Sequence, residues 1–249
     1  MEILYETHFS QYLGRTMEYK VYGGQGLPCI AFAPEGGRFF DWEDHGMTAA
    51  AARWIEEGKL TLLCPDSLDG QTFLAQGDVR PRAELHERWV CYLTREFLPQ
   101  VQALFPEQKP LLVGCGLGAA HAVSLYLRYP QQFCQVIGLS GLYDTQRFFG
   151  KTQDDLVFRS SPLCTLPALP ESSAVLQTLR QGAPLILCSG QGQGAEADAL
   201  ADCQALAAVL EQQCVPCCTD AWGFDVTHDW HWWAKQLEFF LDTQIFPAV

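Results

Sequence analysis

The chain lacks the segments that would place it in a membrane or direct it to one. None of its 249 residues belong to an apolar run near the ~18 residues that a membrane-spanning helix needs. The sequence opens with Met1 and the acidic Glu2, without the basic residues and long apolar run of a secretory signal. We therefore expect a cytoplasmic protein that does not associate with membranes.

Positive charge is scarce. The chain has 16 Lys and Arg residues against 29 Asp and Glu residues, which gives a formal net charge of −13. Such a balance repels the phosphates of nucleic acids and of anionic lipid headgroups. The composition therefore argues against nucleic acid and membrane surfaces as partners.

The eleven cysteines do not have the spacing of a disulfide framework. Several stand singly inside apolar runs, where a free thiol behaves as a small buried hydrophobe in a reducing compartment: Cys29, Cys64, Cys91 and Cys188. The one cluster, Cys214-Val-Pro-Cys217-Cys218, lacks the second half of a metal-binding pattern. We interpret it as a strand with packed thiols, and we predict neither a metal nor a cofactor.

The chain also lacks internal repeats, low-complexity segments and linkers, so we expect a single domain over residues 1–249. Alternating residues predict an antiparallel pair of strands at 3–9 and 16–22. Short apolar runs then predict strands at 28–33, 60–64, 111–114, 136–139, 185–188 and 217–221. Because helical patterns separate these runs, the fold class is α/β: a mostly parallel sheet with helices on both faces and an antiparallel N-terminal edge.

Helical spacing predicts helices over 46–57, 82–104, 119–129, 197–212 and 230–242. Residues 141–183 show no clear period and contain Pro162, Pro167 and Pro170. We expect an irregular insertion there, which either caps the carboxyl ends of the strands or wraps the edge of the sheet.

One turn lacks the residue that its pattern demands. Gly114-Cys115-Gly116-Leu117-Gly118 joins a predicted strand to a predicted helix with the spacing of the nucleophile elbow G-x-S-x-G of α/β-hydrolases. Gly116 stands where the serine belongs, and glycine has no side chain that can attack a carbonyl. The alternative is a glycine-rich turn that binds phosphate at a helix N-terminus. We favour the elbow, because dinucleotide fingerprints normally belong to the first βα unit.

The partners of a nucleophile follow in the order acid, then histidine, on loops after later strands. His228 follows the last predicted strand and is our candidate general base, although a packed or capping role is the alternative. Glu196 is our first choice for the acid and Asp198 the second. Either carboxylate would also be favoured simply by lying in the first turn of a helix. Asp229 is predicted to cap the helix that follows.

The loop Pro34-Glu35-Gly36-Gly37-Arg38 follows an early strand, where an oxyanion hole takes one of its N–H donors. We predict that the donors are the N–H of Leu117 and that of Gly37 or Arg38. Backbone donors do not depend on the side chain at position 116, so the hole is expected to persist.

These segments together resemble the esterase D-like family of α/β-hydrolases, and within it a branch of bacterial esterases. The resemblance is carried by Gly-Cys-Gly-Leu-Gly-Ala-Ala-His-Ala at 114–122, Leu-Ser-Gly-Leu-Tyr-Asp at 139–144 and Trp-Gly-Phe-Asp-Val-Thr-His-Asp-Trp at 222–230. It spans about residues 28–241. It implies a serine hydrolase acting on carboxylic-ester or thioester acyl groups, with His228 as the general base. The chain departs from the family at Gly116.

Three functional interpretations follow. The protein is an esterase whose serine was deliberately replaced by Gly116, or a natural pseudoenzyme that binds an acyl ligand or a protein partner, or the carrier of unrelated chemistry at Cys115 or a metal. We expect the Cys115 sulfur to face the core, because adjacent side chains on such a turn point in different directions. Ser140 and Ser189 are more simply explained as turn residues than as nucleophiles. His121 is expected to pack against a neighbouring loop.

The aromatic residues leave two questions open. Some either line an apolar acyl pocket or belong to the core: Phe39, Phe40, Trp42, Phe148 and Phe149. Trp230, Trp232 and Trp233 indicate either an interface or a buried last helix. We favour a homodimer, because three aromatic residues at mixed helical phases cannot all face one core.

Overall fold

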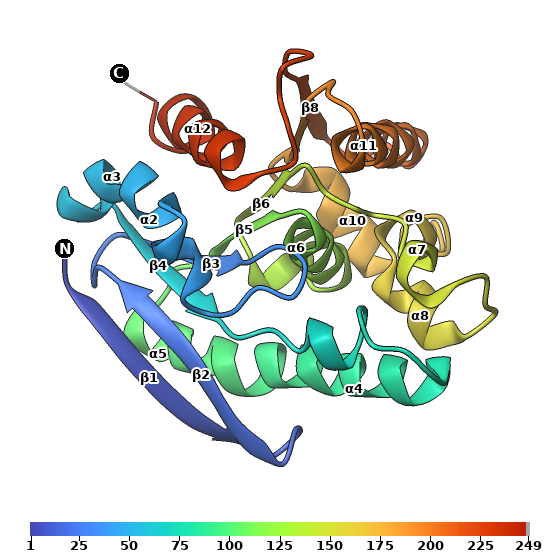
Figure 1. Cartoon of the computed structure of the whole chain (residues 1–249), viewed down its shortest axis with the longest axis horizontal. Helices are drawn as coiled ribbons and strands as arrows, with labels where there is room; N and C mark the ends of the chain where they lie inside the picture. Colours follow the sequence, from blue (N-terminus) through green and yellow to red (C-terminus); the bar gives the residue numbers. More distant parts are fainter. Residues whose placement is uncertain (248–249) are drawn as a thin grey trace.

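The computed structural model describes residues 1–247 and is built on an eight-stranded sheet with the order β1-β2-β4-β3-β5-β6-β7-β8 (Figure 1). The strands are β1 Ile3–Ser10, β2 Arg15–Tyr22, β3 Leu27–Phe32, β4 Leu60–Pro65, β5 Leu111–Cys115, β6 Gln135–Leu139, β7 Leu185–Ser189 and β8 Cys217–Ala221. Strand β2 pairs antiparallel with β1 and with β4, and the remaining neighbours are parallel. The predicted parallel sheet with an antiparallel N-terminal edge is confirmed.

The central strands are apolar because both of their faces are covered. Every residue of β4, β5 and β7 is buried. A strand between two helix layers cannot alternate polar and apolar residues, and it reads as a continuous apolar run instead. By contrast, most residues of the edge strand β1 are exposed.

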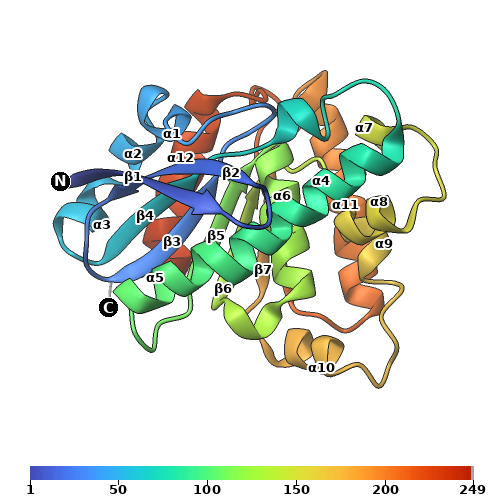
Figure 2. The same cartoon turned by 90° about the horizontal axis from the view of Figure 1, so that it is seen from below.

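Helices cover both faces of the sheet (Figure 1). One face carries α1 Asp41–Asp44, α2 Met47–Ala50, α3 Ala52–Glu56 and α12 Trp230–Phe240. The other carries α4 Val79–Tyr92, α5 Leu98–Leu104, α6 Leu117–Arg128, α10 Ala174–Gln181 and α11 Ala195–Gln212. Figure 2 shows α4 and α5 running across this second face. Each layer buries its own apolar cluster against the sheet, so the protein has a core on either side.

Two predicted helices are each divided in the structure, and the other three differ from their predicted bounds by at most two residues at an end. The helix expected over 46–57 is divided at Ala51 into α2 and α3, and α1 precedes it unpredicted. The helix expected over 82–104 begins earlier, at Val79, because Pro81 is tolerated in a first helical turn. A π-helical turn, Leu93–Phe97, then joins α4 to α5.

The prediction of an irregular segment over 141–183 is wrong. The segment contains α7 Gln146–Phe149, α8 Asp155–Ser160, α9 Pro162–Thr165 and α10, and it contacts α4, α6 and α11. Pro162 stands at the first position of α9, and the Asp154 carboxylate caps α8 through the N–H groups of Leu156 and Val157. Proline and polar residues here mark the starts of short helices. These helices contain too few residues for a hydrophobic repeat to be recognised in the sequence.

The tryptophans of α12 have partners within the chain. Trp233 is buried, Trp230 stacks on His45 with ring centroids 4.6 Å apart, and Trp232 packs edge-on against Trp222. The reason given above for a homodimer interface is therefore removed, because the indoles contact neighbouring elements as well as the core. None of the helices within residues 1–247 has the length and hydropathy to cross a bilayer.

Candidate active site

Gly116 forms a sharp turn between β5 and α6, with φ 53° and ψ −122°. Residues with side chains rarely adopt this conformation. Its flanking glycines are required by packing: a Cβ on Gly114 would lie 2.1 Å from the Gly118 carbonyl oxygen, and one on Gly118 would lie 2.3 Å from that of Ala33. The turn therefore has the strained backbone and small neighbours of a nucleophile elbow.

The structure brings His228 and Glu196 together. His228 Nδ1 lies 3.1 Å from Glu196 Oε2, and the Glu196 side chain is fully buried in the first turn of α11. The other carboxylate oxygen accepts hydrogen bonds from the Ser140 hydroxyl, at 3.0 Å, and from the Gly190 N–H. Asp198 is exposed and pairs with Arg147 instead. The first-choice acid thus contacts the histidine and the second choice does not.

His228 faces the turn that lacks a side chain. A Cβ placed on Gly116 would lie 3.1 Å from His228 Nε2. The loop after β8 brings the imidazole there, and its ring packs edge-on against Trp233 with centroids 5.0 Å apart. Asp229, the next residue, caps α12 through the Trp232 N–H at 3.2 Å, which confirms the predicted cap.

Glu35 is a site residue that sequence reasoning missed. A Cβ on Gly116 would lie 2.6 Å from Glu35 Oε2 and 3.1 Å from Oε1, and Oε1 is 3.8 Å from His228 Nε2. The Glu35 carboxylate therefore fills the space that a serine side chain would need. Its position just after the carboxyl end of a strand is a sequence signal for a site residue, but the prediction for this loop rests on backbone N–H groups alone.

These contacts set the charges of the pair. Burial lowers the pKa of His228, but the carboxylates of Glu196 and Glu35 outweigh burial and raise that pKa to about 9. Burial raises the pKa of Glu35, but His228 and the N–H groups of Glu35 and Leu117 outweigh burial, so the pKa lies below its usual range. At neutral pH, Glu35 is an anion and His228 a cation.

The predicted oxyanion donors are not equally available. The Leu117 N–H faces the Glu35 carboxylate at the elbow. The Gly37 N–H donates to the Pro34 carbonyl at 2.8 Å, and the Arg38 N–H donates to Asp41 Oδ2 at 2.8 Å. Gly37 and Arg38 already have acceptors within their own loop. The N–H of Glu35, by contrast, lies close enough to its own carboxylate to lower the pKa of that group.

Two other candidates lie in the core, as the sequence predicted. Cys115 is buried in the apolar cluster beneath α12, where burial raises the pKa of its thiol well above the usual range. His121 Nε2 is hydrogen-bonded to Asp69 Oδ1 at 2.9 Å, with both side chains buried. Asp69 Oδ2 also accepts from the Gly36 N–H at 3.4 Å. This pair anchors the loop that carries Glu35 to α6.

The aromatic residues proposed as pocket lining divide between core and surface. Phe39, Trp42 and Phe149 are buried, whereas Phe40 and Phe148 are partly exposed. A polar hollow of about 230 Å³ lies beside the Glu35 loop, lined in part by Gly36, Arg38, Asp66 and Ser67. These side chains make the vicinity of the site more polar than the sequence suggested.

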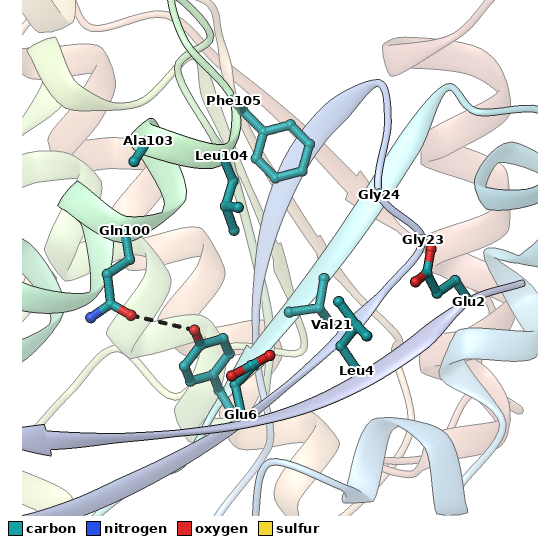
Figure 3. A pocket seen from close by; sticks show the side chains of 11 residues that line it. Glu2, Leu4, Glu6, Val21, Gly23, Gly24, Gln100, Ala103, Leu104 and Phe105 are labelled. Carbon is teal, nitrogen blue, oxygen red and sulfur yellow. Dashed lines mark hydrogen bonds between the residues drawn. The ribbon is translucent and has the colours of Figure 1, made fainter.

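A larger groove, of about 570 Å³, lies between the β1–β2 hairpin and α5 (Figure 3). Leu4, Val21, Leu104 and Phe105 line it, and the Tyr19 hydroxyl donates to Gln100 Oε1 beside it at 3.3 Å. None of the candidate active-site residues lines this groove.

The cysteine cluster predicted as packed thiols has no disulfide bonds. Cys214, Cys217 and Cys218 are free thiols. Over the part of the chain that the structure describes, no three His, Cys, Asp or Glu side chains come together as a metal site would require.

The chain is similar in sequence to one protein family and in fold to several solved structures. Residues 10–241 match the family model described as "Putative esterase". An S-formylglutathione hydrolase from Agrobacterium tumefaciens aligns with a TM-score of 0.75 at 12% identity, over 96% of this chain and 92% of that one. A ferulic acid esterase aligns with a TM-score of 0.70 at 14% identity, over 96% and 95%. MPT51 from Mycobacterium tuberculosis aligns with a TM-score of 0.69 at 15% identity, over 95% and 96%. No curated protein matches the sequence.

Proposed function

Because the chain belongs to this esterase family, we propose that its elbow end is a hydrolase site for carboxylic-ester or thioester acyl groups in which Gly116 replaces the nucleophile. The observation that carries the proposal is the 3.1 Å between His228 Nε2 and a Cβ built on Gly116, with Glu196 on the other imidazole nitrogen. A base and its orienting acid are thus arranged around a missing side chain.

A serine at position 116 would complete a known mechanism. His228 would take the hydroxyl proton as the oxygen attacks the acyl carbonyl, and would return it to the leaving group. Glu196 would hold the imidazole tautomer through Nδ1. The Leu117 N–H and the N–H of Glu35 would stabilise the oxyanion, and we assign the second donor to Glu35 rather than to Gly37 or Arg38.

With Gly116, no acyl-enzyme can form. A triad hydrolase without its nucleophile retains roughly 10³–10⁴-fold acceleration over water, which comes from the oxyanion hole and binding alone. We therefore propose that the chain is inactive as an esterase. This conclusion is the same whether the glycine is natural or was introduced in place of serine.

The second candidate is a pseudoenzyme that binds an acyl ligand or a protein partner. The Glu35 anion favours it, because a carboxylate at the elbow opposes the negative charge of a developing oxyanion. The names of two structural neighbours, a ferulic acid esterase and an S-formylglutathione hydrolase, support an acyl compound as the ligand.

Hydrolysis of p-nitrophenyl acetate and butyrate tests the proposal. The unmodified chain and the matched control Gly116→Ala should show no turnover above background. Gly116→Ser, alone or with Glu35→Ala, should turn over, and adding His228→Ala should abolish the activity.

If no serine variant turns over while all remain folded, the esterase proposal is wrong and the binding role takes its place. Activity of the unmodified chain that Cys115→Ala removes would instead support chemistry at the thiol.

A further inference from the structure

We infer that Glu35 is a built-in occupant of this site, a carboxylate that lies where an ester would meet its nucleophile and that must leave before an acyl group or a free carboxylate can bind. The inference rests on the proposed function for the identity of the elbow. It adds a second residue, besides Gly116, that keeps the site inactive, and it names small carboxylates as the ligand class.

Both Glu35 carboxylate oxygens lie within 2.6–3.1 Å of the Cβ position of residue 116. A serine hydroxyl extends from that Cβ into the same volume. A serine introduced at position 116 would therefore have to push the Glu35 carboxylate aside or adopt a rotamer that points away from His228.

The Glu35 carboxylate faces the His228 imidazole and the N–H of Leu117, the groups that a hydrolase directs at the acyl carbonyl and its nucleophile. While the Glu35 carboxylate lies beside them, it occupies the space from which a substrate would reach these groups. The same groups form a binding site for the carboxylate of any small acid that takes the place of Glu35.

The Glu35 side chain can leave the elbow. Its side chain is 27% exposed, and the loop backbone is held independently, by the Gly36 N–H on Asp69 and by the Gly37 N–H on the Pro34 carbonyl. Rotation of one flexible side chain therefore opens the site without unfolding the loop. Truncation of Glu35 should leave the groups around it, the His228 imidazole and the Leu117 N–H, in place and open to a ligand.

Acetate binding tests the inference without catalysis. The His228 imidazole resonances report on binding while sodium acetate is titrated at constant ionic strength. Glu35→Ala should show saturable shifts with a dissociation constant of about 1–10 mM. The unmodified chain and Glu35→Gln should show no saturable shifts, because a side chain at position 35 still fills the space at the elbow. The surface control Glu211→Ala should show no shifts either.

Ester hydrolysis provides the second arm. Gly116→Ser with Glu35→Ala should exceed Gly116→Ser alone in kcat/KM by about tenfold to a hundredfold, because oxyanion donors are released. Equal kcat/KM values, together with no acetate binding by folded Glu35→Ala, would overturn the inference. If Glu35→Ala binds acetate but no serine variant hydrolyses esters, the esterase proposal fails and the carboxylate site stands.

Discussion

Under the proposed function, the single residue at position 116 separates this hydrolase scaffold from its chemistry. At φ 53° and ψ −122°, glycine adopts this backbone more readily than any residue with a Cβ. The serine of an active hydrolase accepts the strain because the turn aims its hydroxyl at the histidine. Without the hydroxyl, the strain has no function, and glycine relieves it.

The change Gly116→Ser should therefore destabilise the folded chain. We expect the free energy of unfolding to fall by about 1–3 kcal/mol, from backbone strain and from displacement of the Glu35 carboxylate. Urea unfolding of both proteins, followed by tryptophan fluorescence, measures the difference.

Gly116→Ala serves as its control, because it adds the same Cβ without the hydroxyl and should cost a similar amount. A serine variant more stable than the unmodified chain would show that the elbow is not strained.

Glu35 and His228 illustrate that a site's charge state depends on contacts between distant segments. The carboxylate comes from the loop after β3 and the imidazole from the loop after β8. With a pKa of about 9, only about one His228 in a hundred is neutral at pH 7 and able to accept a serine proton. Removing the Glu35 charge would lower that pKa and restore a base.

At the scale of elements, the first turn of α12 sets the position of His228. The Asp229 carboxylate satisfies the Trp232 N–H, which would otherwise lack a partner at the start of the helix. Trp233, one residue further, packs against the His228 ring. The cap and the tryptophan therefore hold the loop and the helix as one unit.

Asp229→Ala should lower the free energy of unfolding by about 1 kcal/mol, the usual cost of losing a helix N-cap. Asp229→Ser is the matched comparison, because serine also caps helices and should recover most of the loss. Thermal or urea unfolding measures both variants. Equal stability of the alanine and serine variants would mean that the carboxylate contributes through another contact.

At the scale of the whole molecule, the raised pKa of His228 links stability to pH. The pKa rises from 6.5 to about 9 on folding. The folded state therefore binds the proton more tightly than the unfolded state. The resulting stabilisation is complete below pH 6.5 and is lost as the pH rises towards about 9.

We therefore expect the unmodified chain to lose on the order of 3 kcal/mol relative to His228→Gln as the pH rises from 6.5 to about 9. Urea unfolding of both proteins at each pH measures this difference, and other titrating groups cancel in the comparison. A constant difference across this range would mean that folding does not raise the His228 pKa.

Much of the molecule could be predicted from the sequence, because the features concerned are local. Strands and helices follow from the spacing of apolar residues, which depends only on which neighbours share a face. The proposal that the nucleophile is missing rests on one residue, Gly116, in a short motif. His228 and Glu196 follow from chain order, because loops after parallel strands meet at one end of the sheet.

Only the tertiary structure decided what lies in the space at the elbow and which carboxylate contacts the histidine. Glu196 and Asp198 are two residues apart on α11, so they point in different directions, and only the packing of α11 on the sheet selects between them. Glu35 reaches Gly116 although the two are 81 residues apart along the chain. Side-chain direction in a loop depends on backbone angles that tertiary contacts fix, and no local periodicity encodes it.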